Sequence, residues 1–389
     1  MSRPAAHTDR LIALDGLRGV ASLVVLTQHL VRTLPYFAPF VLWDNGNDPR
    51  GALQWFLFRG PPRLLWAGQN AVIVFFVLSG FVLSLAWLTG HAPSYRRFVT
   101  ARVCRIYLPY LAIMLIAWAL AEWLRHQPGA TAGEWANVLG WTDPTSTATL
   151  PSVLLMLGNY SSRWIDPPIW SLVWEMRVSL LFPLLVAPIM AFGLRGTLTL
   201  IVVLAIVWVG ANSAMEMAPA LNALLYRPQE TFYYAGFFVL GCTLARYRAP
   251  LAAFGGRGDG SYAMGLLVAG LICCGPYWPI QHGTIVGVGA GLLIVAAISK
   301  GRPQAWFTAR PIQWLGRVSY SLYLVHVPVI LTAEYLLFGK IPAVAIVVAV
   351  FPVCLLGAEL FYRAVERPSM LLGRELGRRM VAVAQSKIA

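Results

Sequence analysis

Long apolar stretches alternate along the chain with short polar or basic segments. A helix needs about 20 apolar residues to cross the roughly 30 Å hydrocarbon core of a bilayer. Ten stretches approach that length, at about residues 11–31, 70–89, 106–124, 168–191, 197–212, 230–245, 262–280, 283–299, 318–338 and 341–362. They are too long and too uniformly apolar for the alternating strands of a membrane barrel. We therefore predict an all-α fold, a polytopic transmembrane helical bundle of about ten helices.

The distribution of basic residues predicts how this bundle is oriented. When the N-terminus is placed inside, most of the 30 Lys and Arg residues fall in inside segments, as the positive-inside rule requires. This predicts that both termini are cytoplasmic and that a basic tail from about residue 364 lies along the inner membrane surface. We expect residues 1–389 to form a single integral-membrane domain, with no cleavable signal and no appended soluble catalytic domain.

The composition excludes several classes of protein. Hydrophobic residues make up 58% of the chain and charged residues only 12%, whereas soluble domains carry about 25% charged residues. The net charge of +14 could indicate nucleic-acid binding, but the basic residues are scattered between apolar runs, so we expect no nucleic acid as partner. The five cysteines show no metal-binding spacing, and we expect no metal site.

Two predicted outside loops, residues 32–69 and 125–167, are rich in tryptophan. Their tryptophans are Trp43, Trp55, Trp66, Trp135, Trp141 and Trp164. Tryptophans at these places commonly anchor a protein at the membrane interface. The alternative is that the loops form a lid or platform for a sugar-like acceptor outside the membrane.

The first apolar span carries three ionisable residues, Asp15, Arg18 and His29. Ionisable side chains inside a bilayer are costly and usually functional. Arg18 and His29 are eleven residues apart, which is close to three helical turns, so they share one helix face about 16 Å apart. That face would hold a fixed cation near the cytoplasm and a titratable base further out. Alternatively, Arg18 extends to the interface and His29 packs against another helix.

An inside segment between the second and third spans carries two arginines, Arg102 and Arg105, at the i,i+3 spacing of one helix face. Paired guanidinium groups suit phosphate recognition, although they could also contact lipid headgroups or only set the topology. In the preceding span, Ser79 and Gly80 lie in the stretch FFVLSGF, where small residues favour close helix packing.

The fourth span places a carboxylate, Glu175, one to two turns inside an apolar helix. Glu175 and Arg177 are two residues apart and do not face each other, so Glu175 needs another partner. His29 is predicted at a similar depth, and a carboxylate that orients a histidine is a known catalytic arrangement. A structural pair with an arginine on another helix is the alternative.

The last two spans contain further polar residues that we interpret as structural. His326 lies near a proline kink and is expected to pack. Glu359 and the run Glu366-Arg367-Pro368 are expected to pair at the interface and to end the last helix at the proline. The sequence contains no P-loop, GxSxG or HExxH motif.

Six motifs, spread in order over the whole chain, resemble the acyltransferase-3 family of bacterial integral-membrane O-acyltransferases. They are residues 14–19 (LDGLRG) with His29, residues 75–81 (FFVLSGF), Arg102-x-x-Arg105, Trp170-Ser171-Leu172 with Glu175, residues 319–326 (SYSLYLVH) and Glu366-Arg367-Pro368. Each motif alone is weak evidence for the resemblance, but six motifs in the expected order are strong evidence. The chain departs from many members directly after Glu175, where Arg177 stands in place of an aromatic residue.

The resemblance implies an activity and a location. An acyl group, often acetyl, would pass from cytoplasmic acyl-CoA, commonly acetyl-CoA, to a hydroxyl of a cell-surface or exported carbohydrate or a similar acceptor. The protein would be a multi-pass protein of the bacterial inner membrane, in contact with membrane lipids and without an SGNH hydrolase-like domain. His29 matches the family histidine regarded as catalytic, Arg18 matches its partner arginine, and Arg102 and Arg105 match the arginines thought to hold the donor.

These roles predict a mechanism. His29 would act as a general base on the acceptor hydroxyl, and Glu175 would hold the imidazole tautomer. An acyl-histidine intermediate is an open alternative. The remaining candidates divide by ligand into Arg18, Ser79, Arg102 and Arg105 for the donor and Trp170 and Asp166 for the acceptor.

Two other functions stay open at this point. Intramembrane Arg, His and Glu residues also suit a proton relay, so the alternative is a proton-coupled transporter or flippase of glycan precursors. Such proteins are often built from inverted repeats, and no internal repeat is visible here. A lipid-binding or assembly subunit would leave the spacing of Arg18 and His29 unexplained.

Overall fold

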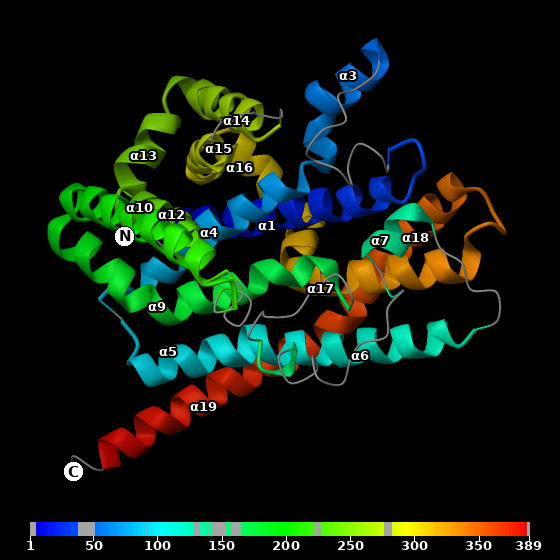
Figure 1. Cartoon of the computed structure of the whole chain (residues 1–389). Coiled ribbons are helices and arrows are strands. Elements are labelled where there is room, and N and C mark those ends of the chain that lie inside the picture. Colours follow the sequence, from blue (N-terminus) through cyan, green and yellow to red (C-terminus); the bar gives the residue numbers. More distant parts are fainter. Residues whose placement is uncertain are drawn as a thin grey trace. The chain divides into compact units, whose positions relative to one another are not determined.

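The described part of the chain is helical. The computed structural model describes residues 5–37, 51–90, 92–127, 133–139, 141, 153–156, 165–220, 222, 227–275 and 282–386. Every regular element in these ranges is a helix, which confirms the predicted all-α fold (Figure 1).

Each of the ten predicted spans coincides with a helix. These helices are α1 (Ala5–Arg32), α4 (Gly68–Leu88), α6 (Leu108–Arg125), α9 (Trp170–Phe192), α10 (Leu194–Met217), α12 (Pro228–Arg246), α14 (Ser261–Cys274), α15 (His282–Ile298), α17 (Arg310–Leu337) and α18 (Ala343–Phe361). The shorter elements are α3 (Ala52–Arg59), η1 (Pro61–Trp66), α5 (Tyr95–Arg102), η2 (Val103–Tyr107), α7 (Glu134–Leu139), η4 (Pro167–Ile169), α13 (Arg248–Gly255), η5 (Gly258–Gly260), α16 (Arg302–Phe307), η6 (Tyr362–Glu366) and α19 (Arg367–Ser386).

Six helical stretches of the described residues are long and apolar enough to cross a membrane. They are Gly68–Leu88, Tyr95–Arg125, Pro167–Phe192, Leu194–Met217, Arg310–Leu337 and Ala343–Met380. On α10 the apolar window of the span has 0% of its residues buried, so hydrocarbon is the environment that its surface fits. The chain is a multi-pass membrane protein, while the count of ten spans and the cytoplasmic termini stay predictions.

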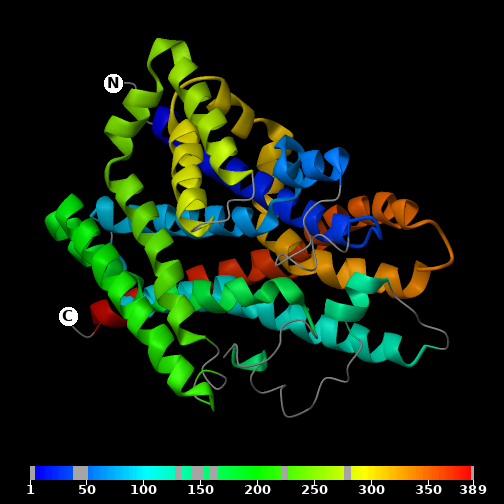
Figure 2. The ribbon, with the colours of Figure 1, turned by 45° about the horizontal axis from the view of Figure 1, so that its top comes forward.

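The chain divides into two compact units. The first comprises Met1–Leu88, Leu185–Leu204 and Ala235–Tyr320, and the second comprises Thr89–Leu184, Ala205–Tyr234 and Ser321–Ala389. In the first unit α1 packs against α4, α15 and α16, and α15 packs against α14. In the second unit α19 lies beside α5 and η2, and η6 lies beside α6 (Figures 1 and 2).

Three glycines allow α1 to touch the chain around the start of α17 backbone to backbone. A Cβ on Gly16 would overlap the carbonyl oxygen of Phe307, and a Cβ on Gly19 would overlap the backbone nitrogen of Gly316. A Cβ on Gly316 would in turn overlap the carbonyl oxygen of Asp15. Small residues promote such close helix contacts where no hydrophobic effect favours association. The glycines of the LDGLRG motif therefore determine where α1 sits in the first unit.

Gly80 has the packing role that its sequence context predicted. It lies on α4 where a Cβ would overlap the backbone of Phe238 on α12, and Gly241 of α12 meets the carbonyl of Val77 in the same way. The neighbouring rings of Phe76 and Phe238 have centroids 6.0 Å apart.

The last helix does not end at Pro368, contrary to the sequence prediction. After α18 the chain widens into the π-helical turn η6 and continues as α19, so that Pro368 falls in the first turn of α19. Proline is tolerated at that position because its missing N–H costs little in a first turn. Glu366 is 3% exposed and accepts a 2.6 Å hydrogen bond from Ser321, so it is a buried residue rather than an interfacial one.

The glycine contact yields a stability prediction. We expect Gly16→Ala and Gly19→Ala to lower the free energy of unfolding by about 1–3 kcal/mol each, the usual cost of overpacking, because each added methyl forces the backbones apart. Unfolding of purified protein in detergent measures the change. Gly265→Ala on α14 is the control, since a Cβ there meets nothing within 4 Å, and equal stability of all three variants would contradict the prediction.

Candidate functional site

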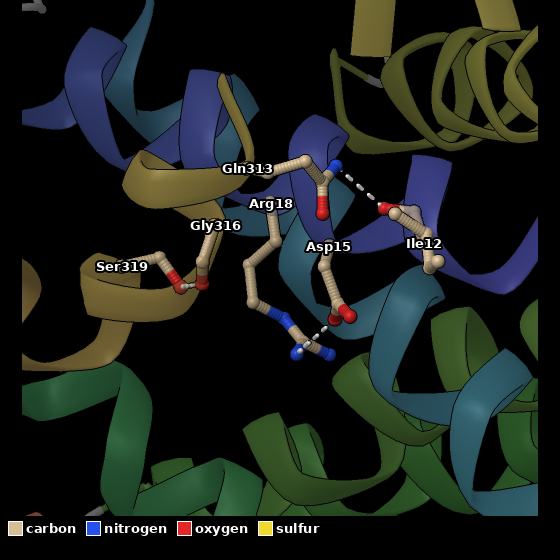
Figure 3. Close-up of polar contacts among 6 residues, drawn as sticks. All are labelled: Ile12, Asp15, Arg18, Gln313, Gly316 and Ser319. Carbon is tan, nitrogen blue, oxygen red and sulfur yellow. Dashed lines mark hydrogen bonds and ion pairs between the residues drawn. The ribbon is translucent and has the colours of Figure 1, made fainter. Parts of the chain in front are cut away.

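In the first unit Arg18 is held by a weak local contact. Its guanidinium lies 3.6 Å from the carboxylate of Asp15, one turn earlier on α1, and the Asp15 side chain is 57% exposed. An ion pair as exposed as this contributes little to stability. In Figure 3 the Arg18 side chain extends to Asp15, away from the Gln313 side chain. This contact is weak enough for another anion to compete with Asp15 for the guanidinium.

Gln313 fixes the backbone beside Arg18. Its amide nitrogen donates a hydrogen bond to the carbonyl of Ile12 on α1, at 2.8 Å (Figure 3). The same nitrogen donates to the carbonyl of Phe307 at the end of α16, at 2.5 Å. The amide therefore links three chain segments that meet at the glycine contact. The sequence analysis did not single out Gln313, although it stands three residues before Gly316, at the same close crossing.

His29 is buried, and its tautomer is defined by its own helix. The side chain is 8% exposed, and Nδ1 lies 2.9 Å from the carbonyl oxygen of Val25. A carbonyl oxygen only accepts hydrogen bonds, so Nδ1 carries the proton in the neutral ring and Nε2 holds the lone pair. Because α1 is continuous from Ala5 to Arg32, Arg18 and His29 share one face as predicted.

In the second unit Arg102 and Glu175 form an ion pair. Nη2 of Arg102 donates to Oε1 of Glu175 at 3.0 Å and to Oγ of Ser179 at 2.9 Å. The two charged side chains are only 10% and 20% exposed. The structure therefore gives Glu175 an arginine on another helix as partner, the alternative left open by the sequence. The Val25 carbonyl accepts the Nδ1–H of His29, and the catalytic role of Glu175 stays a prediction.

The π-helical turn η2 separates the two arginines of the loop motif. Arg102 precedes the turn and points into the protein, with 8% exposure, whereas Arg105 lies within the turn and is half-buried. The i,i+3 spacing places two residues on one face only in a regular α-helix. A π turn adds residues to each revolution, so the common face expected from the sequence does not hold here.

Asp166 is a buried carboxylate that makes no hydrogen bond. It is 0% exposed, and neither Oδ1 nor Oδ2 has a hydrogen-bond partner. It stands at the N-cap of η4, where an aspartate normally accepts a backbone N–H from the following turn. Pro167 and Pro168 have no N–H, and the N–H of Ile169 bonds the backbone carbonyl of Asp166 at 3.2 Å. The two prolines thus leave the carboxyl without a local donor.

A hydroxyl pair and an aromatic cluster lie next to Asp166. Tyr323 donates to the carbonyl of Pro168 at 2.7 Å, and its oxygen lies 2.6 Å from Oγ of Ser171. Trp170 and Trp174 are in edge contact, with ring centroids 5.0 Å apart, and Trp174 stacks on Tyr234 at 4.8 Å. The structure therefore brings Asp166 and Trp170, both predicted as acceptor residues, to the same end of α9.

Tyr323 and Ser179 are polar residues that the sequence analysis did not assign. Tyr323 lies within the SYSLYLVH motif, which was the available signal, while nothing in the sequence distinguishes Ser179. His326 is 0% exposed and bonds the carbonyl of Leu322 through Nδ1 at 2.9 Å, a packing arrangement. Ser79 is buried on α4.

Some tryptophans of the predicted outside loops are buried inside the protein and are not exposed to anchor it at the membrane interface. Trp135 and Trp141 are 1% and 0% exposed, whereas Trp55 is 60% exposed. Trp43 and Trp164 lie outside the described residues. In the described ranges no three His, Cys, Asp or Glu side chains gather to hold a metal.

Comparison with known proteins places this arrangement in context. The model of the Acyl_transf_3 family, described as an acyltransferase domain, matches residues 11–363. Acyltransferase MdmB of Streptomyces mycarofaciens is 27% identical over 96% of this chain and 95% of its own length. O-acetyltransferase OatA of Staphylococcus aureus is 26% identical over 54% of this chain and 37% of its own length. No solved structure matches the chain significantly.

The buried ion pair yields a prediction for a double-mutant cycle. We expect Arg102→Gln and Glu175→Gln each to lower the free energy of unfolding by about 3 kcal/mol, because each leaves one buried charge unpaired. The double variant leaves no charge and should cost less than the sum. Denaturation in detergent measures all three, with Arg363→Gln as control because that side chain is 68% exposed in its pair with Glu359. Additive losses would contradict the assignment.

The isolated carboxyl yields a prediction for pH. Burial raises the pKa of Asp166 well above its usual value of 3.8. The stability that the neutral form contributes is therefore full below the unfolded-state pKa and is lost as pH rises through the folded-state pKa. We expect Asp166→Asn to unfold at a higher temperature than wild type at about pH 8, with the difference shrinking towards pH 4. Thermal unfolding across this range is the measurement, and a difference independent of pH would refute it.

Proposed function

Because the chain belongs to the acyltransferase-3 family, and is thus a membrane acyltransferase, we propose that it moves an acyl group, acetyl in the first instance, from cytoplasmic acyl-CoA to a hydroxyl. The acceptor is a cell-surface or exported carbohydrate or a similar molecule, and the location is the inner membrane of a bacterium. The observation that carries the proposal is the tautomer of His29, whose Nδ1–H bonds the Val25 carbonyl.

In this reaction His29 is the general base. Nε2 accepts the proton of the acceptor hydroxyl while the hydroxyl oxygen attacks the thioester carbonyl. The carbon–sulfur bond then breaks, and the CoA sulfur leaves with the proton that the imidazolium returns. The Val25 carbonyl keeps Nδ1 protonated throughout and stabilises the positive ring by a hydrogen bond. An acyl group carried by Nε2 is the covalent variant of the same chemistry.

The donor role is assigned to arginines. CoA carries several phosphates, and guanidinium groups bind phosphates through charge-assisted hydrogen bonds. Arg18 suits this role because its contact with the exposed Asp15 carboxylate is long, at 3.6 Å, and Arg105 suits it because the side chain is half-buried. Arg102 would have to exchange Glu175 for a phosphate, so we assign it first to holding Glu175 in place. Ser79 is retained as a donor contact on the resemblance alone.

The acceptor role is assigned to Asp166 and Trp170. The Asp166 carboxyl has two oxygens without a hydrogen-bond partner, and a hydroxyl is a suitable donor to either. A proton-coupled transporter was the alternative function. It would use the same buried charges without an acyl donor, so consumption of acyl-CoA separates the two functions.

His29→Ala gives the direct test of the mechanism. We expect it to lower acyl transfer by 10²-fold or more, the usual contribution of a general base, while acyl-CoA binding is retained. Turnover and binding are measured on purified protein in detergent with acetyl-CoA.

His126→Ala is the matched control, because His126 also bonds a carbonyl one turn back through Nδ1, at 2.7 Å from Glu122, on the exposed end of α6. It should leave turnover unchanged. Retained turnover in His29→Ala would refute the assignment of His29 as the general base. Absence of acyl-CoA binding in wild type would refute acyl-CoA as the donor.

A further inference from the structure

A second buried carboxylate without full hydrogen bonding lies at the last turns of α17. Glu334 is 1% exposed. Its Oε2 accepts the backbone N–H of Gly133 at 3.3 Å, and its Oε1 has no hydrogen-bond partner. A Cβ on Gly133 would lie 2.9 Å from Oε2, so Gly133, the residue before α7, packs directly on this side chain.

The next residue, Tyr335, is also buried and incompletely bonded. It is 8% exposed, and its hydroxyl has no hydrogen-bond partner. Its ring stacks on Trp141, with centroids 6.2 Å apart and planes at 24°. Gly133 and Trp141, eight residues apart in the chain, therefore contact Glu334 and Tyr335 respectively.

Trp141 connects this region to Asp166. Its indole N–H donates to the carbonyl of Ile165 at 2.8 Å, directly before Asp166 in the chain. The two buried carboxylates are thus carried by segments that meet on the same tryptophan. Together, Asp166, Glu334 and Tyr335 present four oxygen atoms that no protein donor engages.

Such a set of atoms is costly in the absence of a ligand. Each buried polar atom left unsatisfied lowers the stability of the fold, and native proteins contain few of them. Several oxygens beside a stacked pair of aromatic rings suit a molecule with a ring and several hydroxyl groups. The hydroxyls supply the missing donors, and the C–H faces of such a ring pack on aromatic side chains.

We propose that Trp141, Glu334 and Tyr335 form a subsite that binds a polyhydroxyl, saccharide-like part of the acceptor, joined through Trp141 to the residue before Asp166. The identification of this ligand as the acceptor rests on the proposed function. Binding of the ligand itself requires no acyl donor. A hydroxyl of the ligand donates to Oε1 of Glu334, and another exchanges a hydrogen bond with the Tyr335 hydroxyl.

The test measures binding without acyl-CoA. The probes are methyl glycosides of a hexose, a 6-deoxyhexose and an N-acetylhexosamine, with cyclohexanol as a ring that carries one hydroxyl. We expect at least one glycoside, and not cyclohexanol, to raise the unfolding temperature of the wild-type protein in detergent. Glu334→Leu and Tyr335→Phe should each weaken the binding of that glycoside by about tenfold, as expected for one lost hydrogen bond to a buried group.

The two variants are expected to stay folded. Tyr335→Phe removes only a hydroxyl without a hydrogen-bond partner, so its unfolding temperature without glycoside should equal or exceed that of wild type. Glu334→Leu also takes the acceptor from the Gly133 N–H, so its unfolding temperature without glycoside should fall somewhat, and its glycoside effect is measured relative to that lower value. Tyr110→Phe is the matched control, because that buried tyrosine donates to the carbonyl of Val153 at 2.6 Å. It should lose stability and keep glycoside binding.

The outcomes separate this proposal from the proposed function. Glycoside binding that depends on Glu334 and Tyr335, in a protein that does not use acyl-CoA, would support the subsite and refute the acyl transfer. Two results would refute the subsite alone, in a protein that turns over acyl-CoA. One is that no glycoside raises the unfolding temperature of wild type, and the other is that both variants bind the glycoside as wild type does. In a turnover assay, the variants should raise KM for the acceptor and leave acceptor-independent acyl-CoA hydrolysis unchanged.

Discussion

The contact between the backbones of α1 and the start of α17 is the constraint on which the candidate chemistry of the first unit depends. Gly16, Gly19 and Gly316 let the two backbones meet without a Cβ between them, and the Gln313 side chain joins the segments with two hydrogen bonds. In hydrocarbon, where apolar surface provides no drive for association, close packing and interhelical hydrogen bonds are the forces available. Because α1 is one unbroken helix, its position at this contact also sets the positions of Arg18 and His29.

The polar residues of both units follow one rule, that a charge in an apolar environment needs a partner. Arg102 pairs with Glu175 and also donates to Ser179, and Glu366 accepts a hydrogen bond from Ser321. Asp166, Glu334 and Tyr335 are among the exceptions, with buried oxygens that have no hydrogen-bond partner, and Trp141 contacts both Tyr335 and the residue before Asp166. Exceptions of this kind are expected where a protein binds something other than itself.

The sequence predicted what depends on local pattern. The apolar runs located ten helices, and the helix repeat alone placed Arg18 and His29 on one face. It did not predict the partner of Glu175, because the pair with Arg102 joins residues 73 positions apart. It also missed the π turns η2 and η6, because the extra residue of a π turn does not alter the hydrophobic pattern enough to be detected. In η2 the turn places Arg105 on a different face from Arg102. After η6 the chain continues as α19, so the helix does not end at Pro368. The roles of the site residues stay predictions.

Pro167 and Pro168 have a consequence for how the chemistry of this region can change over time. Neither ring needs to touch a ligand, yet together they withhold from Asp166 the backbone donors that a helix start normally offers. Replacing Pro168 by a residue with an N–H would let the helix recruit the carboxylate as its own cap, which favours the fold and removes the oxygens from recognition. The two prolines therefore keep the Asp166 carboxylate free of a local backbone donor, and a substitution that gave it one would raise stability while it removed any recognition by that carboxylate.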